Sequence, residues 1–326
     1  MRNLETKYLG LTLKNPLIVS SSGITSSVDK IKEAEKNGAG AIVIKSIFEE
    51  QINHEANSLQ DIGNDYSEAF DYLQGYVSAN SIDKHIQLIK DVKKAVSIPV
   101  IASINCFSDK QWSSFAKHLE EAGADALELN IYIMPNERGK SGNDIENEYF
   151  DIIKELVKNS NIPVSVKLTY QFTNMINITD RLKSIGVSGV VLFNRLYEPD
   201  IDIDKLEMTH AGVFSNSSDI RIPLRWTAII SDQTKGIDIS TSTGIHDAKA
   251  FIKMILAGAN TVQVCSVLYQ KGISEIKNIL NDVEQWMEQH HFNSLDEVRG
   301  IMSYKSIKDP AIYQRSQFMK YFSDFD

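Results

Sequence analysis

The chain has few cysteines, no dense basic tract and no metal-ligand motif, and each absence excludes a class of protein. Its two cysteines, Cys106 and Cys265, are too few for a disulfide framework, and neither has a CxxC neighbour for zinc or an iron–sulfur cluster. With 34 Lys and Arg against 43 Asp and Glu, the formal charge is -9, which argues against a nucleic-acid surface. We therefore expect a small-molecule ligand, no metal and no nucleic acid.

The sequence also lacks segments typical of export or membrane insertion. Residues 1–7 have no apolar signal-peptide core, and no run approaches the roughly 20 apolar residues of a membrane helix. The scarcity of cysteine fits a reducing compartment. These features predict a cytoplasmic protein without a membrane partner.

The 326 residues, 42% of them apolar, are enough for one large core, and the 17 Gly and 7 Pro are spread along the chain. Composition therefore favours a folded body over disorder. We expect one domain over residues 1–326, with a C-terminal extension at about 300–326.

Short β-branched runs alternate with amphipathic stretches from residue 17 onward, which is typical of parallel strands joined by crossover helices. We expect eight strands: Leu17–Ser20, Ala41–Lys45, Val100–Asn105, Ala126–Asn130, Val164–Leu168, Gly189–Asn194, Ile237–Ser240 and Thr261–Cys265. The helical stretches between them include Val28–Asn37, Ile82–Val96, Gln111–Ala122, Asp151–Asn159 and Ala248–Ala257.

Several of these helices end in a glycine turn, at Gly38, Gly123, Gly186 and Gly258, that leads into the next strand. Eight such units predict an α/β fold, the (β/α)₈ TIM barrel. A doubly wound open sheet is the alternative, although no GxGxxG follows the first strand.

Three further segments modify the barrel pattern. Residues 4–13 alternate weakly around Gly10 and predict an N-terminal hairpin that closes the barrel floor. Insertions at about 46–80 and 195–224 follow the second and sixth strands. Both lie on the face where barrels keep their active sites.

Polar residues stand at the carboxyl ends of the expected strands. Any one of them is explained by a strand end that reaches solvent, but buried unpaired amides and ammonium groups are costly, so the whole set favours a ligand. The set comprises Ser20, Ser21, Ser22, Gly23, Lys45, Ser46, Asn105, Asn130, Lys167, Asn194, Thr243, Gly244, Cys265 and Ser266.

The segment Ser240–Ile245, together with Cys265 and Ser266, occupies the position where many barrels bind phosphate through backbone N–H groups. This placement predicts a phosphorylated ligand. On local sequence alone, a simple turn and helix N-cap explains the same residues equally well.

Several of these motifs, in this order and spacing, resemble those of one family. Asn15-Pro16 with Ser20–Gly23 is similar to an Asn-Pro and Ala-Ser-Gly opening, and Ile44-Lys45-Ser46 to Thr-Lys-Ser. The remaining matches are Glu128-Leu129-Asn130 with Pro135-Asn136, Val166-Lys167-Leu168, Ser242–Ile245 and Ala257–Val264. Over nearly the whole chain the sequence resembles the dihydroorotate dehydrogenases, in particular the soluble class 1 enzymes.

The resemblance implies a barrel that binds FMN and oxidises dihydroorotate in pyrimidine biosynthesis, as a homodimer. It implies a phosphate site near Thr243, Gly244, Cys265 and Ser266. It also implies ring and ribityl contacts from Ser21, Ser22, Gly23, Lys45, Ser46, Asn105, Asn130, Lys167 and Asn194. Lys167 and Lys45 are the expected catalytic lysines, because an ammonium group stabilises the negative charge of a reduced flavin.

The chain departs from the family pattern in three places. The family's Asn-x-Ser-Cys-Pro-Asn, which carries the catalytic base, reads Asn130–Asn136 here, with Ile133 or Met134 at the cysteine position. Tyr132 is the nearest side chain that could replace this base. The Asn-Ser-Met-Gly-Leu-Pro-Asn substrate loop is missing between residues 46 and 80, and Cys265 stands where the family has glycine.

Three functions stay open at this point. The first is dihydroorotate oxidation with an unusual base. The second keeps FMN but uses a different substrate, as the two altered loops suggest. The third is a barrel that binds FMN or another phosphate ligand without turnover. A partner subunit that carries an iron–sulfur cluster is compatible with each enzyme reading.

Overall fold

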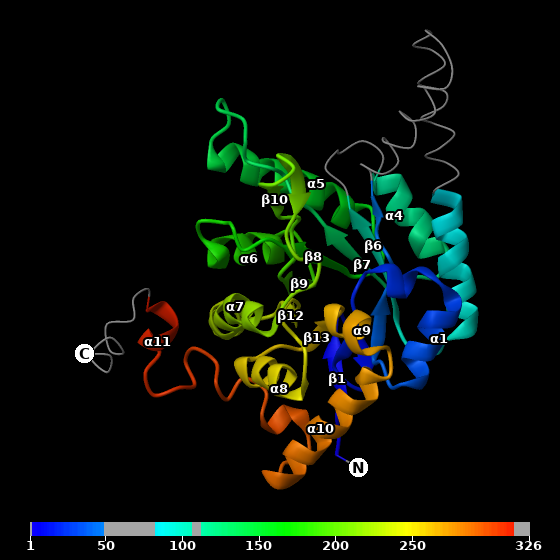
Figure 1. The fold of residues 1–326 in the computed structure, drawn as a ribbon, viewed down its shortest axis with the longest axis vertical. Helices are drawn as coiled ribbons and strands as arrows, with labels where there is room; N and C mark the ends of the chain where they lie inside the picture. The colour runs from blue at the N-terminus through cyan, green and yellow to red at the C-terminus, as the bar shows by residue number, and fades with distance from the viewer. Residues whose placement is uncertain (1, 49–81, 106–111, 316–326) are drawn as a thin grey trace.

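A computed structural model describes residues 2–48, 82–105 and 112–315. Within these ranges, eight parallel strands close into a barrel, which confirms the (β/α)₈ fold (Figure 1). The strands are β3 (Leu17–Val19), β4 (Ala41–Val43), β6 (Val100–Asn105), β7 (Ala126–Asn130), β8 (Val164–Leu168), β9 (Gly189–Leu192), β12 (Asp238–Thr241) and β13 (Thr261–Val264). Their hydrogen-bonded order is β4-β3-β13-β12-β9-β8-β7-β6, and β4 also pairs with β6.

All eight expected strands are present, although several are shorter at their ends. The barrel strands are buried along almost their whole length, for example all five residues of β8. This burial explains why they read as continuous Val, Ile and Leu runs, because crossover helices cover the outer face of a parallel sheet. A short strand, β5 (Ile47–Phe48), extends the sheet beside β6.

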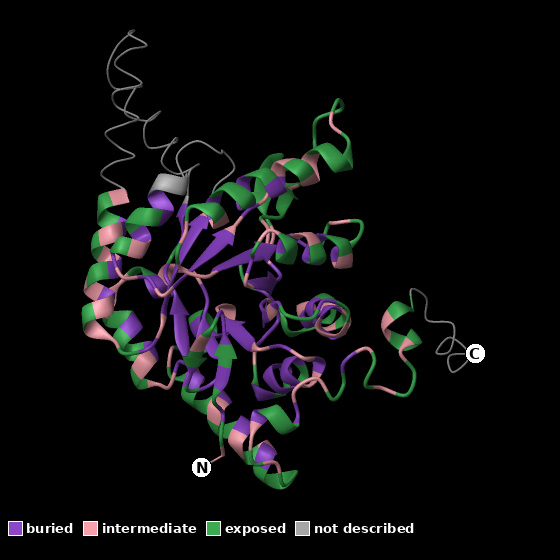
Figure 2. Ribbon diagram, turned by 180° about the vertical axis from the view of Figure 1, so that it is seen from behind, coloured by how far each residue is buried: buried purple, intermediate pink, exposed green. Residues whose placement is uncertain are grey.

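Helices surround the barrel, with their exposed sides outward and the buried strands inside (Figure 2). They are α1 (Val28–Lys36), residues 82–95, α4 (Trp112–Glu121), α5 (Gly142–Lys158), α6 (Met175–Ser184), α7 (Arg221–Gln233), α8 (Ala248–Ala257), α9 (Ser266–Lys271) and α10 (Glu275–Gln289). Helix α5 begins well before the expected Asp151. A capping box between Ser141 and Asp144 starts it there, a signal that the apolar periodicity alone misses.

The repeated glycine turn is also confirmed. Gly38, Gly123, Gly186 and Gly258 all have positive φ angles, at 106°, 99°, 96° and 112°. A left-handed residue at this position ends the helix and turns the chain back toward the sheet. The same short turn therefore places four of the crossover connections.

The expected N-terminal hairpin is formed by β1 (Thr6–Tyr8) and β2 (Leu11–Leu13), which pair antiparallel. Its side chains Tyr8, Leu9 and Leu13 pack in one buried cluster with residues of the barrel strands. The Leu9 N–H donates a hydrogen bond of 2.7 Å to Asp238 Oδ2 at the start of β12. The hairpin therefore closes the amino-terminal end of the barrel.

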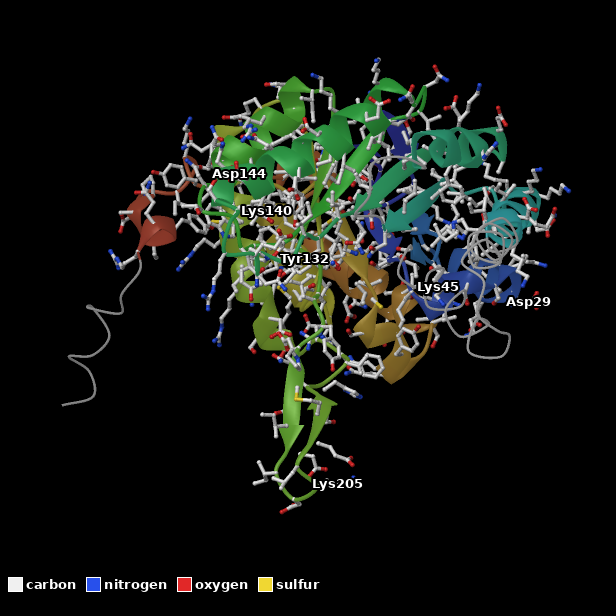
Figure 3. All side chains as sticks on the ribbon, turned by 90° about the horizontal axis from the view of Figure 1, so that it is seen from above. Asp29, Lys45, Tyr132, Lys140, Asp144 and Lys205 are labelled. Carbon is white, nitrogen blue, oxygen red and sulfur yellow. The ribbon has the colours of Figure 1, made fainter. Side chains whose placement is uncertain are left out.

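The insertion at 195–224 forms an antiparallel ribbon of β10 (Pro199–Asp202) and β11 (Glu207–His210), followed by a 3₁₀ turn, η2 (Ser217–Ile220). Figure 3 shows this ribbon projecting from the barrel, with Lys205 near its outer end. Most of the other expected insertion, at 46–80, lies outside the described residues.

The described part of the C-terminal extension runs along α7. The Tyr304 N–H donates to the Ala228 carbonyl at 3.0 Å, and Arg225 donates to the Arg315 carbonyl at 3.2 Å. A short helix, α11 (Ala311–Gln314), precedes this last contact. The expected residues 316–326 lie outside the described ranges.

We predict that His85 makes the fold sensitive to mild acid. Burial lowers the pKa of His85 to about 4, so the unfolded chain, with a pKa near ~6.5, binds more protons below neutral pH. The His85 contribution to the free energy of unfolding should therefore fall by about 2 kcal/mol between pH 7 and pH 5. Urea unfolding of His85→Leu at both pH values should lack this loss. The exposed His118→Leu should keep it, and equal pH dependence in both variants would contradict the prediction.

Candidate functional site

Two cavities open at the carboxyl ends of the barrel strands. The first cavity has a volume of about 680 Å³, within the usual range of roughly 300–1,000 Å³ for small-molecule sites. The second cavity, of about 1250 Å³, lies beside it. The site therefore lies on the face that the sequence predicted.

The predicted site residues divide between the cavities. The first is lined by Ser20, Ser21, Ser22, Gly23, Lys167, Asn194, Thr243, Gly244, Cys265 and Ser266. The second is lined by Ser21, Ser46, Asn105, Asn130, Tyr132, Lys167, Asn194 and Thr243.

Lys45 is the one predicted residue that lines neither cavity among the described residues. Its side chain is exposed, and its backbone N–H donates to the Thr25 carbonyl at 3.2 Å. The structure thus places the two predicted lysines in different surroundings.

The two cavities share part of their walls. Ser21, Lys167, Asn194 and Thr243 line both of them, and each follows or ends a different barrel strand. A ligand in the first cavity and a second molecule in the other would therefore meet at this boundary. Such an arrangement suits a cofactor and a substrate that exchange electrons.

Lys167 is the charged group at this boundary. Its side chain is only 8% exposed, and its Nζ lies 3.7 Å from Glu128 Oε1. The same Nζ donates to Ser20 Oγ at 3.3 Å. Because a buried ammonium group is costly without a partner, the adjacent carboxylate accounts for its position inside the barrel.

Hydroxyl and backbone groups gather at one end of the first cavity. Ser215 Oγ donates to Ser266 Oγ at 3.1 Å and lies 3.0 Å from His246 Nε2. The Gly244 N–H points to the same Ser215 oxygen, at 3.4 Å. This hydroxyl cluster, made of Ser215, Gly244, His246 and Ser266, has the donors that a phosphate group requires.

The walls of the first cavity combine a close backbone approach with aromatic rings. A Cβ at Gly244 would meet Ile220 N at 2.3 Å, so the backbone approaches this closely only because residue 244 is glycine. Phe214 and Tyr269 form an aromatic wall with ring centroids 5.4 Å apart. The cavity thus has the hydroxyl cluster, an aromatic wall and the buried Lys167 in its lining or directly beside it.

Cys265 lies in the wall of the first cavity, at the position where the family has glycine. Burial raises the pKa of its thiol, although Ser22 and Lys167 act in the opposite direction. The thiol is therefore protonated at neutral pH and serves as a small polar surface. A side chain at this position is compatible with an open cavity.

The second cavity offers amides and aromatic rings. Asn130 Oδ1 is buried and has no hydrogen-bond partner among the described residues, so it can accept a bond from a ligand. Tyr132 Oη donates to Gln171 Oε1 at 3.1 Å. The two residues at the cysteine position are Ile133 and Met134, and Met134 is 59% exposed. An alkyl group or a thioether does not accept a proton, so neither residue provides a base.

The sequence analysis missed Ser215 and Arg195, which follow the sixth strand within the predicted insertion. Arg195 donates to the Gly212 and Val213 carbonyls, at 2.7 and 3.3 Å, and pairs with Asp219 at 3.3 Å. It thus ties the beginning of the insertion to its end. The capping pattern from Asn216 to Asp219 could have indicated that the chain returns to the site here.

Comparison with known proteins agrees with this geometry. The family model described as dihydroorotate dehydrogenase matches residues 3–287.

None of the helices within the described ranges has the length and apolar character needed to span a bilayer.

Curated relatives carry the name dihydroorotate dehydrogenase B (NAD(+)), catalytic subunit. The protein from Thermoplasma acidophilum is 27% identical over 92% of this chain and 99% of its own length. The protein from Methanocaldococcus jannaschii is 25% identical over 91% of this chain and 97% of its own length. The protein from Pyrococcus furiosus is 27% identical over 92% and 98%, respectively.

We predict that Ser215→Ala weakens FMN binding. Loss of a hydrogen bond to a charged phosphate oxygen should raise the dissociation constant about tenfold. Quenching of FMN fluorescence on titration with apoprotein measures this constant. Ser217→Ala, an exposed change in the following turn, is the control, and equal affinities for the two variants would remove Ser215 from the phosphate site.

Proposed function

Because the chain belongs to the dihydroorotate dehydrogenase family, we propose that it is an FMN-dependent oxidoreductase that converts dihydroorotate to orotate in pyrimidine biosynthesis. The observation that carries this proposal is the position of Lys167. It is a buried lysine that lines both cavities. The same side chain can therefore contact the cofactor on one side and lie close to the substrate on the other.

Residues of the first cavity would hold FMN. Ser215, Gly244 and Ser266 would bind its phosphate, and Lys167 would contact its ring. Bound FMN supplies the acceptor for the two electrons that leave the substrate. The Lys167 ammonium group would then stabilise the negative charge that appears on reduction. The remaining predicted contacts that line this cavity are Ser21, Ser22, Gly23, Asn194, Thr243 and Cys265. Ser46, Asn105 and Asn130 line the second cavity, and Lys45 lines neither.

Amide groups of the second cavity support a substrate with ring N–H and C=O groups. Asn130 Oδ1 has no partner among the described residues, and Asn105 and Asn194 line the same cavity. An asparagine side chain can both donate to and accept from such a ring. Dihydroorotate carries both kinds of group, so this lining matches its chemistry.

Tyr132 is the residue we propose to receive the proton that the oxidation releases, as its phenolate, after its own hydroxyl proton has passed to solvent. It lines the second cavity, and its hydroxyl is held by Gln171. The two residues that replace the family's cysteine cannot accept a proton. In the loop of residues 130–136, Tyr132 is the residue nearest in sequence to the missing cysteine whose side chain can take part in proton transfer.

We predict that Tyr132→Phe slows anaerobic reduction of bound FMN by dihydroorotate about 100-fold, because proton transfer contributes at least this much to such reactions. Stopped-flow absorbance measures the rate, and photoreduction should be unchanged. Tyr170→Phe, which alters another hydroxyl that lines the second cavity, is the control. A Tyr132→Phe rate equal to that of the parent would exclude Tyr132 from the reaction.

A different substrate is the second candidate function. Its support is the altered loop in which Ile133 or the exposed Met134 stands where the family has its base. Chromatographic detection of orotate after incubation with dihydroorotate and a dye acceptor separates the two functions. Orotate formation supports dihydroorotate, whereas an FMN-loaded protein that forms none supports the other substrate.

The β10–β11 ribbon supports a homodimer. Ile201 and Met208 are directly opposite each other in the ribbon, and they are 60% and 69% exposed. An isolated two-stranded ribbon is marginally stable, and an uncovered apolar face is typical of an interface.

The curated relatives are named as catalytic subunits, so we propose that an electron-accepting subunit also binds this chain.

We predict that Met208→Lys weakens the homodimer at least about tenfold, because it places an unpaired charge in the interface. Light scattering after size-exclusion chromatography over a concentration series measures the change. Thr209→Lys introduces the same charge at the neighbouring position on the opposite face of the ribbon and should dimerise normally. A parent protein that is monomeric, or two variants that behave alike, would contradict this interface.

A further inference from the structure

Glu128 is the one ionisable residue of the Glu128-Leu129-Asn130 segment, and it has no role so far. It lies in the middle of β7, and its side chain is 1% exposed. Burying a carboxylate costs several kcal/mol unless other groups compensate it. The groups around Glu128 therefore show what the carboxylate does.

Glu128 and three other side chains, from four strands or strand ends in all, form a closed ring. Lys167 Nζ donates to Ser20 Oγ at 3.3 Å, and Ser20 Oγ donates to Gln263 Oε1 at 2.9 Å. Gln263 Nε2 donates to Glu128 Oε2 at 2.6 Å. The ion pair between Glu128 and Lys167, at 3.7 Å, completes this polar ring. All four residues are buried.

The direction of every bond in the polar ring follows from the lysine. An ammonium group can only donate, so Ser20 Oγ accepts from it and directs its own hydrogen to Gln263 Oε1. The Gln263 amide is thereby oriented with its N–H group toward Glu128, where a carboxylate oxygen accepts. The ring thus has one consistent set of hydrogen-bond directions, with Lys167 and Glu128 facing each other as its ion pair.

The length of the ion pair leaves the ammonium group available to a ligand. At 3.7 Å, Glu128 Oε1 makes no hydrogen bond, and it has no other hydrogen-bond partner among the described residues. Lys167 keeps N–H groups that can point toward the cavities, both of which it lines. Glu128 compensates the charge without occupying the face that a cofactor would contact.

We infer that Glu128, acting through the polar ring with Ser20 and Gln263, is the positioning residue that holds the Lys167 ammonium group at the boundary between the cavities. The inference rests on the proposed FMN function. It assigns Glu128 a part in setting the reduction potential of the bound cofactor, although Glu128 lines neither cavity.

The sign of the potential change distinguishes this role from two others. If Glu128 acts through Lys167, Glu128→Gln removes the partner that holds the ammonium group at the boundary, less positive charge faces the cofactor, and the FMN potential falls. If Glu128 acts only as a nearby negative charge, its removal raises the potential. If it only supports the fold, the potential stays the same.

The experiment is a double-mutant cycle on the FMN-loaded protein, with the midpoint potential measured by dye equilibration. Glu128→Gln and Lys167→Met should each lower the potential and slow reduction by dihydroorotate about tenfold, and the double variant should show no further loss. Glu128→Asp, which keeps the charge, should recover most of the parent potential. Ser20→Ala breaks the ring at an uncharged link and should lower the potential less than Glu128→Gln does.

Each other outcome overturns a specific claim. A higher or unchanged potential in Glu128→Gln, or additive losses in the double variant, overturns the positioning role alone. If Glu128→Gln does not fold, a parent-like potential in Ser20→Ala overturns it instead. An unchanged potential in Lys167→Met overturns both this inference and the proposed role of Lys167. A protein that binds no FMN overturns the proposed function itself.

Discussion

The site depends on how an ammonium group can be kept inside a closed barrel. The Lys167 side chain lies in a low-dielectric interior, where an isolated charge would lose its proton or destabilise the fold. Glu128 supplies the opposite charge from the neighbouring strand, because the β7–β8 register pairs Asn130 with Lys167 and brings the two strands side by side. The ammonium group can then remain at the boundary of two cavities.

Most of the fold follows from local sequence patterns. Continuous Val, Ile and Leu runs mark the eight strands, and the glycine turns after Gly38 and Gly258 place the chain for the next strand. A parallel barrel directs every strand end to one face, so the polar residues that follow the strands could be predicted to converge. The start of α5 was missed because a capping box, rather than apolar periodicity, determines it.

The remainder of the site depends on contacts between distant segments, which periodicity does not reveal. Gln263 bonds to Glu128 across 135 positions of sequence, and Ser215 reaches Ser266 from an insertion. The position of the Lys45 side chain also depends on long-range packing. Although it follows a barrel strand, this side chain is exposed and lines neither cavity. Strand order predicts which residues share a face of the barrel. It does not predict which of these residues form hydrogen bonds with one another, because that depends on the packing of distant segments.

The central claim is that this barrel uses bound FMN to oxidise dihydroorotate although the family's base is replaced. Anaerobic titration of the FMN-loaded protein with dihydroorotate, followed by the visible flavin absorbance, tests it most directly. The account predicts that the absorbance bleaches with one equivalent of substrate per flavin and that orotate appears in the same amount. A flavin that stays oxidised in excess dihydroorotate would contradict it.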